Sequence, residues 1–488
     1  MCRQRFHFSS DAVKRPLAEE MLKRRSDLPA AAFSIHSIDS KDERELTMEM
    51  ENWFIKFRCL TGIGAALFIS GTALAGESTQ IPHELTPEAV FSQTVHNTHS
   101  VNSGCAPACD ANGCSPSGCD AAVGALSNSG CDGCDLSNSG CDGCSDSCGW
   151  CNLGEEYRLI GTMDRGIDVG GWFQFGYHNK RNGLFNNHPN AFNLHQGWIY
   201  AEKLADGSCG LDWGFRVDAM YGVDGADTQA FGNDPGEWDF RNGFDHGRYG
   251  WAIPQLYAEI ASGDWNLKVG HFFTLVGYEV VPATGNFFYS HAYTMYNSEP
   301  FTHTGALVSY NASDSLTVYG GWTLGWDTGF DQMSNGNIFI GGFSKSLGDN
   351  VTATYITTIG DFGARSDEGY SHSFVVDVAV TDKLNYIFQT DAVFEDAYVA
   401  AMSGAGPTFD NEQYGINQYL IYTINDCLAA GTRVEWWKND SDSQYAATFG
   451  VNVRPHANLL FRPEIRHDWN PNARNNFTTF GVDMILTY

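Results

Sequence analysis

From about Asp168 to the C-terminus, apolar and polar residues alternate in short runs that are separated by turn-forming residues. The last run has an apolar residue at every second position, Phe480, Val482, Met484, Leu486 and Tyr488, with Gly481, Asp483 and Thr487 between them. Successive side chains of a strand point to opposite faces, so this run predicts a strand with one apolar face. A half-buried edge strand of a soluble sheet would show the same alternation, and this run alone leaves both interpretations open.

Sixteen such runs are predicted to be strands. They span 168–178, 192–204, 209–222, 251–261, 264–272, 303–312, 314–326, 337–346, 349–360, 371–381, 383–395, 411–424, 426–438, 443–454, 456–469 and 476–488. Short turns at 205–208, 262–263, 313, 347–348, 382, 425 and 455 alternate with connections that are usually longer. An even strand number with short turns at one edge and longer loops at the other is typical of bacterial outer-membrane barrels.

The short turns share a local sequence pattern. Asp264, Asp314, Asp349, Asp382 and Asp426 each stand two or three residues before an apolar residue that opens a strand. Asp suits tight turns because its short side chain bonds nearby backbone amides and tolerates left-handed conformations. A propeller or a sandwich does not require connections of alternating length, so this rhythm favours a barrel.

Charged residues within the predicted strands fall on one face. Because Arg or Lys facing the bilayer midplane costs about 2 to 4 kcal/mol, the apolar face is predicted to meet lipid and the charged face the lumen. The predicted pore-lining residues are Asp212, Arg216, Asp218, Arg433, Glu435, Arg462, Glu464, Arg466 and Asp468. Sixteen strands enclose an aqueous channel. The charges either select polar solutes through a transverse field or merely pair with one another across the lumen wall.

The connection 274–302 is rich in aromatic residues for a solvated loop. It contains Tyr278, Phe287, Phe288, Tyr289, Tyr293 and Tyr296. One hypothesis is that it folds into the lumen as a constriction whose aromatic faces guide sugar-like or other amphiphilic solutes. The alternative is an outer cap packed on neighbouring loops.

Composition supports the same class. The chain of 488 residues is 18% charged and 14% aromatic and contains 53 glycines, which fits an all-β fold with many turns better than long helices. Since no segment reaches about 18 to 20 continuous apolar residues, a helical integral membrane protein is excluded.

The N-terminal part carries the features of an export signal. Lys56 and Arg58 precede an apolar block from Leu60 to Leu74, and Ala73-Leu-Ala-Gly76 is a small-residue cleavage site. We therefore expect a signal peptide over 48–75, cut after Ala75, and interpret 1–47 as a leader or a misassigned extension before a start at Met48 or Met50. Removing 1–75 takes away 11 basic and 10 acidic residues and leaves 18 basic and 48 acidic ones. This excess of negative charge disfavours nucleic acid as a partner and would instead attract cations.

Ten of the fourteen cysteines lie in a low-complexity linker, 76–167, which is predicted to be disordered. They are Cys105, Cys109, Cys114, Cys119, Cys131, Cys134, Cys141, Cys144, Cys148 and Cys151, and the segment Leu126–Cys134 is repeated at Leu136–Cys144. Pairs of C-x-x-C spacing bind zinc in a reducing compartment, but an exported chain favours structural or intermolecular disulfides. Metal capture and thiol exchange are the alternatives. We interpret the linker as a crosslinkable arm toward envelope proteins.

Four motifs resemble the putative β-barrel porin-2, OmpL-like family. They are Gln255-Leu-Tyr-Ala-Glu259, Lys268-Val-Gly-His-Phe272 with Val276-Gly-Tyr278, Asn286-Phe-Phe-Tyr-Ser-His291, and Glu299-Pro-Phe-Thr-His-Thr-Gly-Ala306. The resemblance covers about 168–488 and implies an outer-membrane barrel with pore activity. The resemblance identifies no substrate and does not extend to the cysteine-rich arm.

The function predicted from these features is a porin-like channel in the outer membrane for small polar solutes or ions, without a cofactor or a metal. Partners are membrane lipid, the solutes, further copies of the chain and envelope proteins bound through cysteines. A structural barrel that anchors the arm is the main alternative. An outer-membrane enzyme is less well supported, because no Gly-x-Ser-x-Gly or His-Glu-x-x-His motif occurs and His291 and His303 near Ser290 and Ser298 are ordinary loop residues. The acidic residues Asp224, Asp227, Asp234, Glu237 and Asp239 do not have the spacing of a calcium loop and are interpreted as solvated.

Overall fold

The computed structural model describes residue 151 and residues 153–163, 166–331, 335–397 and 410–488. All of them belong to one compact unit of the chain, His83–Tyr488. The predicted leader 1–47, the signal peptide 48–75 and most of the cysteine-rich linker lie outside the described residues, so those assignments stay predictions.

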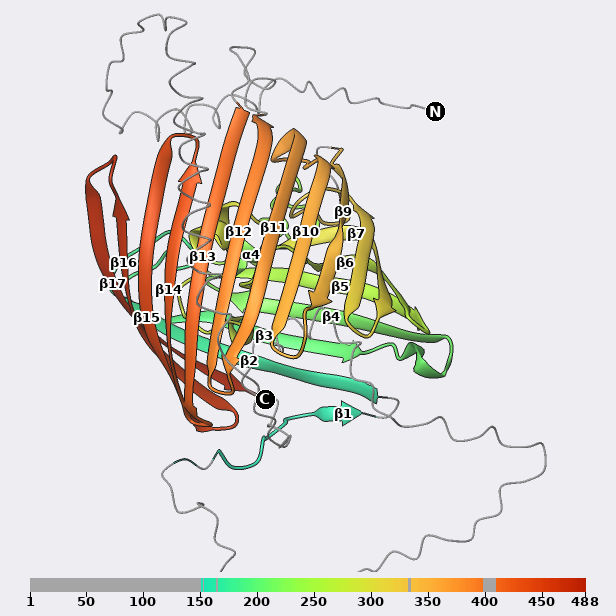
Figure 1. The fold of residues 1–488 in the computed structure, drawn as a ribbon, viewed down its shortest axis with the longest axis horizontal. Coiled ribbons are helices and arrows are strands. Elements are labelled where there is room, and N and C mark those ends of the chain that lie inside the picture. Colours follow the sequence, from blue (N-terminus) through green and yellow to red (C-terminus); the bar gives the residue numbers. More distant parts are fainter. Residues whose placement is uncertain (1–150, 152, 164–165, 332–334, 398–409) are drawn as a thin grey trace, which may run out of the picture. The chain divides into compact units, whose positions relative to one another are not determined.

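Sixteen antiparallel strands form a closed barrel (Figure 1). They are β2 (Ile167–His178), β3 (Asn193–Lys203), β4 (Asp212–Gly222), β5 (Gly250–Ser262), β6 (Trp265–Phe273), β7 (Thr302–Ser313), β8 (Leu316–Thr323), β9 (Asn337–Ser346), β10 (Val351–Asp361), β11 (Ser366–Thr381), β12 (Leu384–Ala397), β13 (Asp410–Asn425), β14 (Leu428–Asn439), β15 (Asp442–His456), β16 (Leu459–Asn470) and β17 (Asn475–Thr487). Each strand pairs with the next, and β17 pairs with β2, which closes the sheet. A further short strand, β1 (Gly161–Met163), pairs with the start of β2. The predicted all-β fold, a closed antiparallel barrel of about sixteen strands, is confirmed.

The connections at one edge of the barrel are short. Residues 263–264, 314–315, 347–350, 382–383, 426–427 and 457–458 make six of them, and the five turn aspartates of the sequence pattern lie in five of these turns. The seventh connection at this edge, between β3 and β4, contains the short 3-10 helix η2 (Gly207–Cys209), in which the Ser208 amide donates to the side chain of Asp206. The long loops 223–249, 274–301 and 324–336 all join strand ends at the opposite edge.

The two faces of the wall have opposite chemistry. On β14 and β16, Val434 and Ile465 point outward and are 46% and 50% exposed, whereas their neighbours Arg433 and Arg466 point inward and are 0% exposed. A soluble protein places its apolar face inside, so an apolar exterior around buried charges is the arrangement of a barrel in lipid.

One strand ends earlier than the sequence pattern predicts. The run 314–326 was expected to be a strand throughout, but β8 stops at Thr323. Gly325 and Asp327 have φ angles of 109° and 48°, which break the strand. Trp326 instead stacks on Phe362 at 4.4 Å between ring centroids.

In the described segments, the remaining helices are single turns: α4 (Gly225–Thr228), η3 (Ala283–Gly285) and α5 (Tyr293–Asn297). Within the described residues, none of the helices combines the length and the apolar content needed to cross a membrane.

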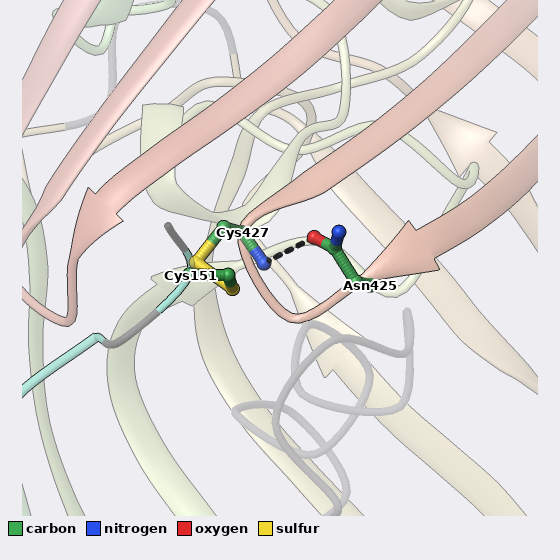
Figure 2. The surroundings of a disulfide bond; sticks show 3 residues. All are labelled: Cys151, Asn425 and Cys427. Carbon is green, nitrogen blue, oxygen red and sulfur yellow. Dashed lines mark hydrogen bonds between the residues drawn. A yellow bond between two sulfur atoms is a disulfide. The ribbon is translucent and has the colours of Figure 1, made fainter. Parts of the chain in front are cut away.

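A disulfide joins the described end of the cysteine-rich segment to the barrel. Cys151 is bonded to Cys427 in the turn between β13 and β14, and the Cys427 amide donates to Asn425 Oδ1 (Figure 2). The following residues run along the same edge, where the Ala457 amide donates to Leu153 and Asn458 bonds both the amide and the carbonyl of Tyr157. Of the predicted disulfide cysteines, Cys151 therefore pairs within the chain. Its partner, Cys427, is not among the ten cysteines predicted to form disulfides. The other nine lie outside the described residues.

Candidate functional site

The aromatic loop 274–301, which joins β6 to β7, packs against inward-facing side chains around the barrel. Its residues Val281, Ala283, Ala292, Met295 and Phe301 form a core with Trp172, Trp198, Met220, Ala252 and Ile485 of β2–β5 and β17. Leu275 and Val276 pack with Tyr257, Phe272, Leu307, Tyr319, Ile340 and Ile356 of β5–β10. Phe288 packs with Val375, Ile387, Tyr419 and Ile421 of β11–β13. The loop therefore lies inside the barrel and is not packed as an outer cap.

Three buried arginines of β14 and β16 hold the loop on the remaining side. Arg433 donates to Glu435 at 2.7 Å, to Glu279 of the loop at 2.6 Å and to the carbonyl of Ser290 at 2.7 Å. Its guanidinium lies 5.1 Å from the centre of the Phe288 ring. Since Arg carries its donors in a rigid planar fork, one side chain can bind two carboxylates and a carbonyl at once.

Arg462 and Arg466, each two residues from Glu464 on β16, repeat this arrangement. Arg462 bonds Asp483 at 3.0 Å and the loop carbonyls of Ala283 and Asn286 at 2.9 and 2.6 Å. Arg466 bonds Asp468 at 2.8 Å, Glu435 at 2.9 Å and the carbonyl of His291 at 2.8 Å. Each of these arginines therefore bridges a wall carboxylate and the backbone of the loop.

Wall carboxylates accept hydrogen bonds from the amides of the same loop. Glu464 accepts from Tyr289 at 3.0 Å and from Ser290 at 3.1 Å, and Glu435 accepts from Tyr293 at 2.8 Å. The Tyr293 hydroxyl donates to Asp468 at 2.9 Å. Loop carbonyls thus meet arginines and loop amides meet carboxylates, which satisfies backbone groups that the loop buries without regular secondary structure.

Glu279 is the loop's own contribution to this network. Burial would raise the pKa of Glu279, but Arg433 and His291, whose Nδ1 lies 3.4 Å from the carboxylate, together with the Ala292 amide lower it to about 2. Glu279 therefore carries its charge at neutral pH and ties the loop to β14.

A second set of polar contacts involves Tyr289. Its hydroxyl lies 2.7 Å from Nε2 of His195 and 3.1 Å from Nδ1 of His178, and Nδ1 of His195 lies 2.8 Å from Asp224. Gly176 and Gly481 make room for the ring, since a Cβ at Gly176 would lie 2.5 Å from the Tyr289 hydroxyl. This series of hydrogen-bonded side chains, Asp224–His195–Tyr289–His178, fixes the middle of the loop to β2 and β3.

The structure brings most of the predicted site residues together. The nine predicted pore-lining residues all point inward, but eight of them are buried, six under the loop and two, Arg216 and Asp218, in an ion pair at 2.7 Å. Asp212 is half-buried and bonds Lys203. Whether these residues border a conducting path stays a prediction.

The six aromatic residues of the predicted constriction lie in the loop that fills the interior. Tyr278 packs on Tyr419 with the rings tilted, Phe287 packs on Phe288, and the Tyr296 hydroxyl donates to Asp227 at 2.9 Å. The remaining members, Tyr289 and Tyr293, are bonded to charged wall residues as described above. Their role in limiting conduction stays a prediction.

Several residues of the network are not among the site residues predicted from the sequence. Glu279, Asp483, Glu299 and Asp391 are buried partners of the loop or the wall. Asp483 lies on the inward face of the last strand. The alternation of apolar and polar residues along that strand could have identified it. Glu279 and Glu299 have no such signal, because their position depends on how an irregular loop enters the barrel.

A small cavity remains between the two arms of the loop and the wall at β5 and β6. Its volume is about 150 Å³, and the residues that line it include Gln255, Lys268, Phe273, Glu299 and Phe301. The loop thus leaves open space inside the barrel beside its own base.

Asp327, in the loop 324–336, holds the second end of the aromatic loop and gives a prediction on pH. Its Oδ1 accepts from the amides of Phe301 and Thr302 at 2.7 and 3.1 Å. Burial raises the pKa of Asp327 to about 7, although the hydrogen bonds from these amides act to lower it. The folded protein therefore favours the protonated form, and its stability falls as pH rises through about 7. Asp327→Asn keeps an acceptor at Oδ1 and tolerates the positive φ, but does not ionise.

We therefore expect Asp327→Asn to be more stable than the wild type at pH 9 and to lose most of that advantage at pH 5. The difference between the two conditions should be about 3 kcal/mol at most, because about two pKa units separate pH 5 from the folded pKa and one unit corresponds to about 1.4 kcal/mol. Urea unfolding midpoints in detergent at both pH values measure it. Asp331→Asn, an exposed position in the same loop, is the control. Equal pH dependence of Asp327→Asn and the wild type would contradict the assignment.

Comparison with known proteins adds the family. No curated protein matches the chain. Among solved structures, the anion-selective porin from Comamonas acidovorans is 9% identical, with a TM-score of 0.47 and coverage of 66% of this chain and 99% of that one. The outer membrane channel DcaP of Acinetobacter baumannii is 10% identical, with a TM-score of 0.45 and coverage of 67% and 98%. OmpT of Vibrio cholerae in its trimer form is 10% identical, with a TM-score of 0.44 and coverage of 66% and 99%.

A family model spans the whole barrel. The model of the putative beta-barrel porin-2, OmpL-like proteins matches residues 166–488, which include every strand of the closed wall and the loop inside it. The chain belongs to the putative beta-barrel porin-2, OmpL-like family.

Proposed function

We propose that the protein is an outer-membrane channel for passive diffusion of small polar solutes or ions, narrowed from within by the loop 274–301. The observation that carries this proposal is the bonding of the loop's backbone, through both carbonyls and amides, to charged side chains of the inner wall. A loop held this firmly has a fixed shape. It would set the width of the path, while the sixteen-stranded wall supplies the diameter.

Cations are the preferred ions in this proposal. Among the buried strand residues that the structure describes, eight are carboxylates and four are arginines; they are Asp218, Glu259, Asp391, Glu395, Glu435, Glu464, Asp468 and Asp483 against Arg216, Arg433, Arg462 and Arg466. An excess of negative charge on an inner surface raises the local cation concentration. Neutral residues at 462 and 466 would change more than the charge of the lumen. Because Arg462 and Arg466 bond loop carbonyls, such variants would also release the loop.

A structural barrel that anchors the cysteine-rich arm is the second candidate. Two observations favour it: the loop packs against strands on every side of the barrel, and Cys151 binds the arm covalently to the barrel edge. An enzyme has less support, because Ser290 Oγ bonds Arg433 and His303 bonds the Thr274 hydroxyl and the Gly325 carbonyl. Oligomers of this chain and envelope proteins bound through the other cysteines stay predictions.

Single-channel recording separates the two candidates. We expect the mature protein, purified from outer membranes and added to a planar bilayer, to give discrete conductance steps and a reversal potential that favours K⁺ over Cl⁻. The control is the same preparation after heating in detergent, which unfolds the barrel. A correctly folded barrel that gives no steps would support the anchoring role and contradict the channel.

A further inference from the structure

The cavity beside the base of the loop 274–301 is lined by a lysine that has no acidic partner. Lys268 of β6 is half-buried, and its ammonium nitrogen lies 4.2 Å from the centre of the Tyr257 ring. Within the described part of the chain, Lys268 forms no ion pair, whereas the four buried arginines of the strands are all paired with carboxylates. Lys268 therefore offers a positive charge to a solute in the cavity.

Two carboxyl groups on the same side of the wall are engaged elsewhere. Glu259, the register partner of Lys268 on β5, accepts from the Ala205 amide at 2.8 Å. Glu299, which also lines the cavity, accepts from Gln389 at 2.6 Å. Burial and the charges of nearby carboxyl groups raise the pKa of Glu299 well above its usual value, so the folded protein favours its uncharged form. Neither group therefore neutralises the lysine by direct contact.

Most of the other residues that line the cavity are apolar. Val276 and Val281 come from the outgoing arm of the loop, and Met295 and Phe301 come from the returning arm. The volume of about 150 Å³ is close to that of an apolar cavity that holds one benzene ring. Thr284 belongs to the same lining and is exposed, so the cavity borders solvent at that point and a solute can reach it.

We propose that this cavity binds a small monocarboxylate with an apolar body, its carboxylate on the Lys268 ammonium and its body between the two arms of the loop. A single carboxylate matches the one basic side chain of the lining, and hydrogen bonds between two charged groups are stronger than those between neutral ones. The excess of carboxylates on the inner wall lowers the local concentration of anions, so burial of the apolar body has to supply part of the affinity.

The role of the cavity as a solute subsite along the path rests on the channel proposed above, but the binding itself does not. Calorimetric titration of sodium benzoate into the full exported protein in detergent at pH 7 tests the binding. We expect one benzoate per chain. Benzamide has the same ring without the charge, and acetate has the charge without the ring, so each should bind at least about tenfold more weakly than benzoate.

Two variants test the part played by the lysine. Lys268→Met removes the ammonium group and keeps a long side chain, so it should lower the affinity for benzoate at least about tenfold and leave that for benzamide unchanged. Lys438→Met is the matched control. Lys438 also lies over a tyrosine ring, 5.7 Å from the centre of Tyr414, but it is four residues from Val434 and therefore on the outer face of β14. This variant should bind benzoate as the wild type does.

Three results would overturn the proposal. They are a wild-type protein that binds no benzoate, equal affinities of the wild type for benzoate and benzamide, and unchanged benzoate affinity in a Lys268→Met variant whose heat-dependent gel migration shows that it is folded. Conductance in a planar bilayer, measured separately, distinguishes the site from the channel. A protein that conducts but does not bind benzoate refutes the site alone, and one that binds benzoate as expected without conducting keeps the site and refutes the channel.

Discussion

Deleting residues 283–297 and joining the two arms with a short glycine linker should raise the single-channel conductance several-fold. This stretch contains the backbone groups that bond Arg462, Arg466 and Glu464, and the Phe288 ring that packs on β11–β13. Without it, the lumen of a sixteen-stranded barrel fills with water. The charged wall residues then become solvated and are not left buried without partners, so the barrel should remain folded.

A matched deletion separates this effect from a general loss of structure. Residues 234–237 form an exposed part of the loop 223–249, and their removal should leave the conductance unchanged. Heat-dependent gel migration shows whether each variant is closed. If the variant without 283–297 is folded and conducts like the wild type, the loop does not limit the path. If only the deletion variant conducts, the loop closes the wild-type barrel.

Much of the wall was predictable because its signal is local. The period of two places Val434 outward and Arg433 inward wherever the strand pairs, and Asp382 or Asp426 marks a turn through contacts with its own neighbours. The end of β8 shows the limit of such reasoning. Aromatic and apolar residues continue to Trp326, but the positive φ angles of Gly325 and Asp327 turn the chain into a loop.

The interior was less predictable, because alternation tells which side chains point inward and not what they meet there. Arg462 and Glu464 were expected to line water, yet both bond the backbone of a loop more than 170 residues away in sequence. The disulfide illustrates the same point, since Cys151 and Cys427 are 276 residues apart and meet only when the barrel is closed. Contacts of this kind follow from the tertiary fold and leave no spacing in the sequence.

Replacing Arg433 by Met should cause the largest loss of stability of any single change in the network. Arg433 is 0% exposed and is paired with Glu279 and Glu435, so its removal leaves Glu279 buried without an arginine and Glu435 with Arg466 as its remaining one. Breaking one member of a buried ion pair costs about 3 to 5 kcal/mol. The urea unfolding midpoint in detergent measures this loss, and a looser loop should appear as noisier open-channel current.

The cost should depend on pH in a defined direction. In the wild type, Arg433 helps to lower the pKa of Glu279 to about 2, and that contribution to stability is present above the ordinary carboxyl pKa and is lost as pH falls toward 2. In Arg433→Met, burial raises the pKa of Glu279 instead, so the carboxyl group can be protonated in mildly acidic solution. The stability deficit of the variant should therefore be largest at pH 8 and shrink at pH 4.

Two further variants identify the cause of the deficit. Adding Glu279→Gln to Arg433→Met removes the stranded charge and should recover most of the lost stability, because neutral buried groups cost less than unpaired ions. Lys438→Met lies on the same strand but is only partly buried and contacts the Tyr414 ring, so it should cost less than about 1 kcal/mol. A deficit in Arg433→Met that is independent of pH, and that the added glutamine does not relieve, would show that lost packing on Phe288 and not stranded charge destabilises the barrel.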